Sequence, residues 1–450
     1  MNHSAKQVSL TDLPDELLIT IGVMLCKTDP KSVLNLACVN LDMDEFYGDF
    51  ARSIKSKLIL LNKYGVKLND KLIQLKKPLV DAFDNVLDAL RLVNPLILRV
   101  TNNSLSSLPD KVDKLGNLRY LTLSNNEYTE LPESLRSLRY LWEIDLSENK
   151  LTELPEWIRD MQSLEQLKVT HNSLSKLPSS LQDLPNLTRL DLSNNLFTEV
   201  PPLIKKLTSL VSLDMDHNQL QELPDWIGEL TSLTQWLSIG YNSITEIPES
   251  IGNLTSLQAL YTSGNALTHL PESIGNLQSL MILSGARNTI THLPDSLGQL
   301  TELEDMDLSY NSLTELPEST RNLTSLKCLM LEENNISSLQ ESLRGLTSLT
   351  TLNMEENLLT ELPEWIDTLT SLTNVDLSYN QITQLPETLG NITSMKDLNL
   401  CSNLFCELPE SLSQLTSLER LDIEDNSEEL KLDDCPILQQ LQSNGCEIVY

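Results

Sequence analysis

Histidine is the residue type of this sequence best suited to holding a metal or moving a proton, and its spacing favours neither role. His171, His217 and His269 lie far apart, whereas metal sites draw several ligands from short spacings. The sequence contains no glycine-rich phosphate loop, no HExxH motif and no nucleophile elbow. We therefore expect no catalytic residue, no metal and no cofactor, and a chain that is not an enzyme.

Aromatic, methionine and arginine side chains offer a different chemistry, the binding of another protein. These residue types supply much of the energy at protein interfaces. Several fall close together in the middle of the chain. The residues expected to contact a partner are Tyr241, Tyr261, Met281, Ile282, Arg287 and Tyr310.

A repeated unit of 23 residues must position them. The unit that begins at Leu303 reads LEDMDLSYNSLTELPESTRNLTS. Across the units, apolar residues recur at positions 1, 4, 6, 11, 14, 18 and 21, with Asn at 9 and usually Pro at 15; the Asn column runs through fifteen units from Asn103 to Asn426. Positions 4 and 6 share one side of a strand, and positions 3, 5 and 7 the other. The Asn amide can satisfy backbone groups of the turn, while Pro followed by an acid suits the first turn of a short helix.

The pattern LxxLxLxxNxLxxLP resembles the leucine-rich repeat. The resemblance implies an α/β fold, a curved solenoid of about 15 repeats with a parallel β-sheet on its concave face. Outward strand positions would bring Tyr261, Met281 and Ile282 to that face. Position 8, just beyond the strand, would add Tyr241, Arg287 and Tyr310.

The same region is irregular. The unit from Leu233 has 24 residues, because Trp236-Leu237 stands where one residue is expected, and position 6 of the next two units holds Thr262 and Gly285. Each leucine lost there should weaken the stack by roughly 2–5 kcal/mol unless something compensates. Functional sites often break local sequence rules, so we expect the partner contact to centre here.

Residues 12–50 carry a second motif. The sequence predicts one helix start in LPDELL, which begins at Leu13-Pro14, and a second at Pro30, before VLNLACV. These two segments resemble an F-box. In that family the apolar surface docks on the Skp adaptor of a cullin-RING ubiquitin ligase. The resemblance assigns adaptor binding to Leu13, Pro14, Leu17, Leu18, Ile21, Leu25, Pro30, Val33, Leu34 and Val39. Residues 40–47 depart from the family, which usually has basic residues and a Trp there. The alternative is a plain helical cap on the solenoid.

These patterns predict five segments. They are a flexible tail at 1–11, an all-α F-box-like head at 12–50, a helical linker at 51–94, the repeat array at 95–430 and a C-terminal cap at 431–450.

Charge and cysteine content limit which partners and which cellular compartment are expected. Residues 1–94 carry twelve basic and twelve acidic side chains, so the net charge of -32 belongs to the array. An acidic array repels phosphate backbones, and we expect no nucleic acid. No apolar run approaches the roughly 18 residues of a membrane span. The seven scattered Cys indicate a reducing, cytoplasmic location.

The two resemblances together imply a substrate-receptor subunit of a Skp/cullin/F-box-type E3 ubiquitin ligase. The head would dock on the Skp adaptor, and the concave face would hold an unidentified target protein. The short LPES-type units also resemble repeats of bacterial effectors, which implies action in the cytosol of a eukaryotic host. The alternative is a non-enzymatic scaffold or inhibitor of a signalling protein such as a small GTPase, with the N-terminal helices only a cap.

Overall fold

The computed structural model describes residues 67–69, 72–75, 97–102, 104–108, 112–113, 115–428, 430 and 435–450. The tail, the F-box-like head and all ten adaptor-binding residues lie outside these ranges, so those predictions stay predictions. The chain divides after Leu187 into two compact units. Each unit is described by itself.

Short strands, one per repeat, form the sheet of each unit. The strands of the first unit are β1 (Lys67–Asn69), β2 (Leu72–Leu75), β3 (Ile97–Val100), β4 (Tyr120–Thr122), β5 (Glu143–Asp145) and β6 (Gln166–Lys168). Those of the second are β7 (Arg189–Asp191), β8 (Ser212–Asp214), β9 (Trp236–Ser238), β10 (Ala259–Tyr261), β11 (Ile282–Ser284), β12 (Asp305–Asp307), β13 (Cys328–Met330), β14 (Thr351–Asn353), β15 (Asn374–Asp376), β16 (Asp397–Asn399), β17 (Arg420–Asp422) and β18 (Glu447–Val449).

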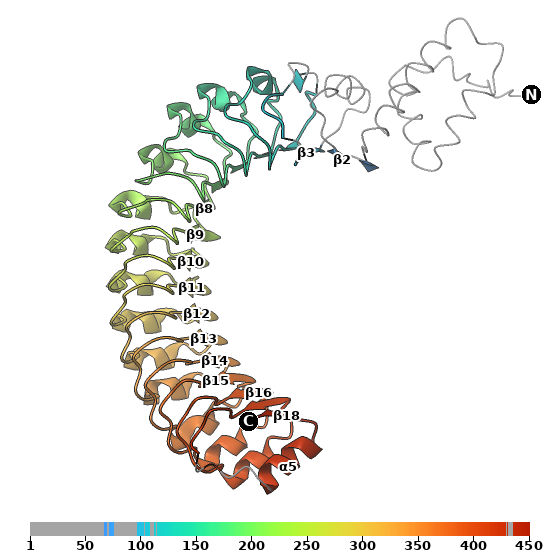
Figure 1. Ribbon diagram of the computed structural model, residues 1–450. Helices are drawn as coiled ribbons and strands as arrows, with labels where there is room; N and C mark the ends of the chain where they lie inside the picture. The colour runs from blue at the N-terminus through green and yellow to red at the C-terminus, as the bar shows by residue number, and fades with distance from the viewer. Residues whose placement is uncertain are drawn as a thin grey trace, which may run out of the picture. The chain divides into compact units, whose positions relative to one another are not determined.

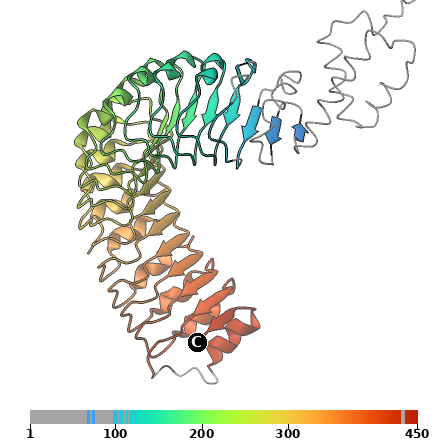
Figure 2. The same cartoon turned by 45° about the horizontal axis from the view of Figure 1, so that its top comes forward.

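From β2 onward, neighbouring strands within each unit pair in parallel, and those of the repeats pair in the register of the repeat. Leu260 of β10, for example, lies opposite Leu283 of β11, one unit further along. In the second unit the strands line the inner side of the curve and short helices line its outer side (Figure 1). The strands of this unit lie side by side and point in one direction as far as β18 (Figure 2). The predicted parallel solenoid of about 15 repeats is confirmed, with β3 to β17 as its strands.

The outer side consists of one 3-10 helix per repeat. In the first unit these are η3 (Glu133–Ser137), η4 (Glu156–Asp160) and η5 (Ser179–Asp183). In the second they are η6 (Pro202–Lys206), η7 (Asp225–Glu229), η8 (Glu249–Asn253), η9 (Glu272–Asn276), η10 (Asp295–Gln299), η11 (Glu318–Asn322), η12 (Glu341–Gly345), η13 (Glu364–Thr368), η14 (Glu387–Asn391) and η15 (Glu410–Gln414), followed by the α-helix α5 (Pro436–Ser443). Pro precedes the 3-10 helices as predicted, except at η12, which follows Gln340.

The acidic residue after that Pro begins its own 3-10 helix and also accepts hydrogen bonds from the first residues of the next helix. Glu156 begins η4, yet its carboxylate accepts hydrogen bonds from the Ser179 and Ser180 N–H groups at the start of η5, at 3.1 and 2.9 Å. Bonds from Ser180 and Ser179 hold the pKa of Glu156 below its usual value. Glu387 accepts from the N–H groups of Glu410 and Ser411 in the same way. The acid therefore caps the next helix along the solenoid, a role that the sequence analysis did not foresee.

The Asn column forms a continuous amide ladder inside the turns. The Oδ1 of Asn334 accepts from the Leu313 N–H of the preceding unit at 2.9 Å. Its Nδ2 donates to the carbonyls of Leu308 and Leu331, at 3.0 and 3.1 Å. Asn334 is 6% exposed, so these bonds satisfy groups that water cannot reach. The predicted role of the Asn is confirmed for the described units.

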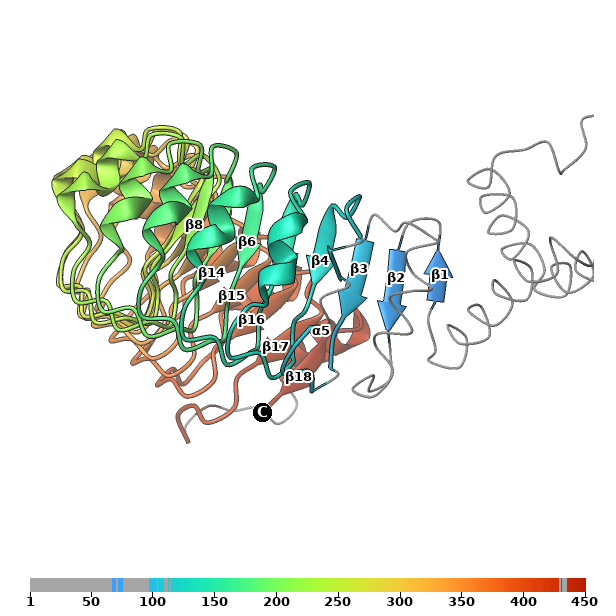
Figure 3. The ribbon, with the colours of Figure 1, turned by 90° about the horizontal axis from the view of Figure 1, so that it is seen from above.

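The helical expectation for 51–94 is wrong at two points. Lys67–Asn69 and Leu72–Leu75 are strands, paired antiparallel with each other, and the second pairs in parallel with β3 (Figure 3). The open sheet edge of the first repeat offers unpaired backbone groups, and these tertiary bonds outweigh local helical preference. At the other end, β18 extends the sheet from within the predicted C-terminal cap.

Other contacts take the place of the missing leucines at positions 262 and 285. Thr262 is fully buried, and its hydroxyl donates to the Ser284 carbonyl at 3.0 Å. A Cβ on Gly285 would already lie 3.2 Å from Cδ2 of Leu308, so neighbouring side chains fill the space that a leucine would take. The extra residue of the 24-residue unit enters before the strand, since Trp236 pairs with Ser212 in normal register.

Candidate functional site

A column of left-handed residues borders the concave face of the second unit. Position 8 of each repeat, just after the strand, has a positive φ, for example 52° at Tyr241, 54° at Arg287 and 55° at Tyr310. This conformation costs roughly 1–2 kcal/mol for an ordinary residue. Backbone bonds between repeats offset it, such as the Tyr310 N–H donating to the Glu332 carbonyl at 2.8 Å. The turn thus presents large side chains at a fixed angle in successive repeats.

Position-8 side chains stack on one another. The rings of His217 and Tyr241 are parallel within 6°, with centroids 4.2 Å apart. On the other side of Tyr241, a Cβ added to Gly264 would lie 2.7 Å from its Cδ1, so only glycine leaves room for the ring in this position. Further along, the guanidinium of Arg287 lies 4.1 Å from the centroid of the Tyr310 ring. The column therefore holds its aromatic rings in fixed orientations.

Between these two stacks the concave face is hollowed by about 500 Å³. The hollow exists because small residues occupy outward positions 5 and 7 of adjacent repeats, namely Gly240, Ser263, Ser284 and Ala286. The Ser263 and Ser284 hydroxyls bond each other at 2.7 Å, and the Ser263 Oγ also accepts from the Ala286 N–H at 3.1 Å. Small side chains that bond among themselves make a firm polar floor. The four small residues can be read from the sequence, but residue size alone does not mark them as part of an interface.

Large side chains line the same hollow. Tyr241, Tyr261, Arg287 and Tyr310, four of the six residues predicted to contact a partner, are among its lining residues, together with Met330. The structure therefore brings these four together. Whether they bind a partner stays a prediction.

The other two predicted residues lie beside the hollow. Ile282 is half-buried in β11, and Met281, directly before that strand, is 39% exposed. Neither is among the lining residues. Both still lie at or next to the concave strand layer, where they could extend a contact.

Carboxylates give the hollow a negative potential. Asp216, Asp307 and Glu332 line it, and Arg287 is the basic residue among the lining. Burial, followed by the charge of Asp307, raises the pKa of Glu332. Burial and then the charges of Asp305 and Asp216 raise the pKa of Tyr261. Both directions are those expected for groups that are partly buried beside negative charges.

The acidic field extends along the strands. Burial, then Asp216 and Asp191, raise the pKa of Asp214 at the end of β8 to about 7. Burial, then Asp305 and Asp307, raise the pKa of the Cys328 thiol to about 11. A thiol with that pKa is protonated at neutral pH and is a poor nucleophile.

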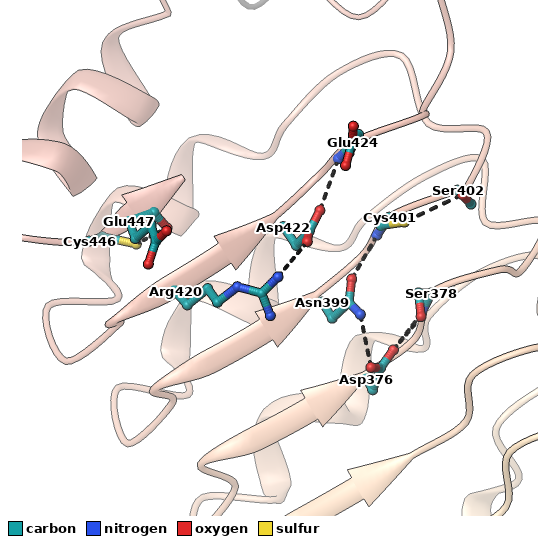
Figure 4. Close-up of polar contacts among 10 residues, drawn as sticks. All are labelled: Asp376, Ser378, Asn399, Cys401, Ser402, Arg420, Asp422, Glu424, Cys446 and Glu447. Atoms are coloured by element: carbon teal, nitrogen blue, oxygen red, sulfur yellow. Dashed lines mark hydrogen bonds and ion pairs between the residues drawn. The ribbon is translucent and has the colours of Figure 1, made fainter. Parts of the chain in front are cut away.

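The C-terminal strands carry a similar row of polar side chains, but these pair with one another (Figure 4). The Nδ2 of Asn399 donates to Asp376 at 2.8 Å, and the Ser378 hydroxyl donates to the same carboxylate at 2.6 Å. Arg420 and Asp422 form an ion pair at 2.7 Å. Asp376 and Asp422 therefore already have side-chain donors or a basic partner.

The histidines within the described part of the chain form no metal site. His217 is engaged in the stack with Tyr241, and the parallel rings of His269 and His292 lie 6.1 Å apart. Across the described residues, no three His, Cys, Asp or Glu side chains are placed to hold a metal ion. In that same part of the chain, no helix has the length and apolar content needed to cross a membrane.

The repeats of this chain match models of a known repeat family. Three models of leucine-rich repeats match, one described as a leucine-rich repeat region at 234–314 and 306–447, another as a leucine rich repeat at 97–151 and 143–197, and a third as two copies of the repeat at 185–228. Among curated proteins, none matches the sequence.

Solved structures resemble the chain over most of its length. A leucine-rich-repeat protein of Leptospira interrogans is 30% identical, with a TM-score of 0.69 over 84% of this chain and 89% of that one. An internalin of Listeria monocytogenes is 27% identical, with a TM-score of 0.61 over 69% of this chain and 88% of that one. A plant peptide hormone receptor, solved in complex with its ligand RGF2, is 26% identical, with a TM-score of 0.58 over 75% and 64% of the two chains.

Proposed function

Because the chain belongs to the leucine-rich-repeat family, a family of protein-interaction scaffolds, we propose that its second unit captures a protein on the concave face at the hollow. One observation carries this proposal: Tyr241 stacked on His217, and Arg287 over the Tyr310 ring, lie at a hollow of the concave face that Tyr261 also lines. Such side chains dominate the energy of protein interfaces when they surround a recess that a partner can fill. The related plant receptor, solved with its peptide hormone, supports the same use of the fold.

We further propose that residues 12–50 attach this receptor to the Skp adaptor, which makes the chain a substrate receptor of a cullin-RING ubiquitin ligase. The support is the sequence pattern from Leu13 to Val39. The LPES-type repeats, and the bacterial sources of two similar structures, support an effector that acts in the cytosol of a eukaryotic host.

The second candidate is a scaffold or inhibitor that binds a signalling protein and recruits no ligase. The observation that favours it is that the hollow and both stacks lie wholly in the second unit. Capture of a protein there would need no contribution from residues 12–50. Binding of the Skp adaptor separates the two candidates.

The adaptor contact is tested by Leu13→Ala combined with Pro14→Ala in the full chain. We expect the double variant to lose co-purification of the Skp adaptor from eukaryotic lysate, because both residues belong to the motif that would dock there. The melting temperature of the repeats should not change. Equal recovery of the adaptor with parent and variant would remove the ligase role and leave the scaffold.

A further inference from the structure

We infer that the hollow receives one basic side chain, Lys or Arg, from the captured protein. This inference rests on the proposed capture at the concave face and adds the chemistry of the occupant. It follows from the charge, the walls and the unused bonding capacity of the hollow.

The charge of the lining is unbalanced. Asp216, Asp307 and Glu332 face a single basic residue, Arg287, whose guanidinium lies over the Tyr310 ring. The described contact of the Arg287 guanidinium is with the ring of Tyr310, 4.1 Å from its centroid. Because a recess with low-dielectric walls concentrates the field of its charges, two excess negative charges attract a cation strongly.

The carboxylates have room for another donor. Asp307 accepts one bond through Oδ1, from the Ser309 N–H at 3.1 Å. Asp216 accepts from the Ser238 hydroxyl and the Gly240 N–H, both through Oδ1. An ionised carboxylate has about four acceptor sites on its two oxygens, so both groups can accept further bonds.

The walls suit a cation on a long apolar stem. The half-buried Tyr261 and the exposed Tyr241 line the hollow together with Ser263 and Ser284. Tyrosine faces attract ammonium and guanidinium groups, and the rings also cover the methylenes of Lys or Arg. An acidic or phosphorylated segment would instead meet like charge and is disfavoured.

The acids of the C-terminal strands differ from those of the hollow in their hydrogen-bond partners. Asp376 also ends a strand on the concave face, but Asn399 and Ser378 already donate to it. A basic side chain would have to displace those bonds. Among the acids of the hollow, Asp216 and Glu332 each have one such donor, Ser238 and Asn353, whereas the bond that Asp307 accepts comes from the backbone N–H of Ser309.

The probe is a phage-displayed library of random peptides, selected on the full chain and counter-selected on the Tyr261→Ser variant. Serine occupies the equivalent position of the neighbouring repeats at Ser238 and Ser284, so this variant should fold normally. We expect the selected peptides to share one Lys or Arg. Changing that residue to Gln should weaken binding about tenfold, as for a desolvated charge pair.

The decisive comparison is a double-mutant cycle with Asp307→Asn, which keeps the Oδ1 acceptor for the Ser309 N–H. On this variant the Lys and Gln peptides should bind almost equally, whereas the matched control Asp376→Asn should keep the tenfold ratio. A ratio that survives Asp307→Asn overturns the inference. Selected peptides that need Tyr261 but carry no basic residue overturn the basic occupant and leave the proposed capture standing. If no peptide remains after counter-selection on the Tyr261→Ser variant, the site itself is contradicted.

Discussion

Replacing Tyr261 by Ser and Tyr310 by Asn together should weaken binding of the captured protein about a thousandfold. Buried aromatic anchors contribute about 2 kcal/mol or more each, and each 1.4 kcal/mol is a factor of ten in affinity. Tyr261 forms a wall of the hollow, and Tyr310 holds the Arg287 guanidinium over its ring. Loss of Tyr310 would also release that positive charge toward the hollow, where it would repel a basic side chain.

Both substitutions use residues that the fold already accepts. Asn tolerates the left-handed conformation and occupies the same position at Asn194, which has a φ of 53°. The matched control is Tyr379→Asn, a change of an exposed tyrosine at position 8 that does not line the hollow. Titration calorimetry with the purified partner should show parent-like affinity for the control. Strong loss with Tyr379→Asn or with Trp142→Ala, together with retained affinity in the double variant, would move the site to an end of the array.

Asn311→Ala should lower the free energy of unfolding by roughly 1–3 kcal/mol, the cost of leaving a buried polar group unpaired. The Oδ1 of Asn311 accepts from the Ile290 N–H at 2.9 Å, and Ile290 is fully buried. Its Nδ2 donates to the carbonyls of Gly285 and Leu308, at 3.0 and 2.9 Å. The carbonyls keep other routes to a donor, but the Ile290 N–H loses its partner completely.

Urea unfolding followed by circular dichroism measures this loss. Asn335→Ala is the control, because it removes an exposed Asn whose backbone N–H keeps its bond to the Leu313 carbonyl. A midpoint for Asn311→Ala equal to that of Asn335→Ala would show that the amide ladder does not stabilise the repeats.

Much of the fold could be predicted because every repeat has the same sequence pattern. The alternation at positions 4 and 6, the Asn at 9 and the Pro at 15 fixed the strand, the turn and the short helix. Strand pairing then follows from stacking, since equivalent residues such as Leu260 and Leu283 must lie opposite each other. Four of the predicted partner-contact residues line one hollow for the same reason, because equivalent positions of adjacent repeats are neighbours in space.

The rest depends on contacts that no single repeat contains. Position 8 is left-handed whether it carries His217, Tyr241 or Arg287, so residue type does not reveal its conformation. The hollow arises from side chains that are small, and a search for large interface residues does not find it. At Thr262 and Gly285, a hydroxyl bond and close neighbours replace the leucine, which only the packed structure shows.

Capture of a protein on the concave face is tested most directly by site-specific photocrosslinking. A photoreactive phenylalanine analogue replaces Met281, which lies beside the hollow and is 39% exposed, or Glu318, which begins η11 on the outer side. The partner isolated with the full chain should crosslink from position 281 and not from position 318. Crosslinking from position 318 alone would place the partner on the outer side and contradict binding at the hollow.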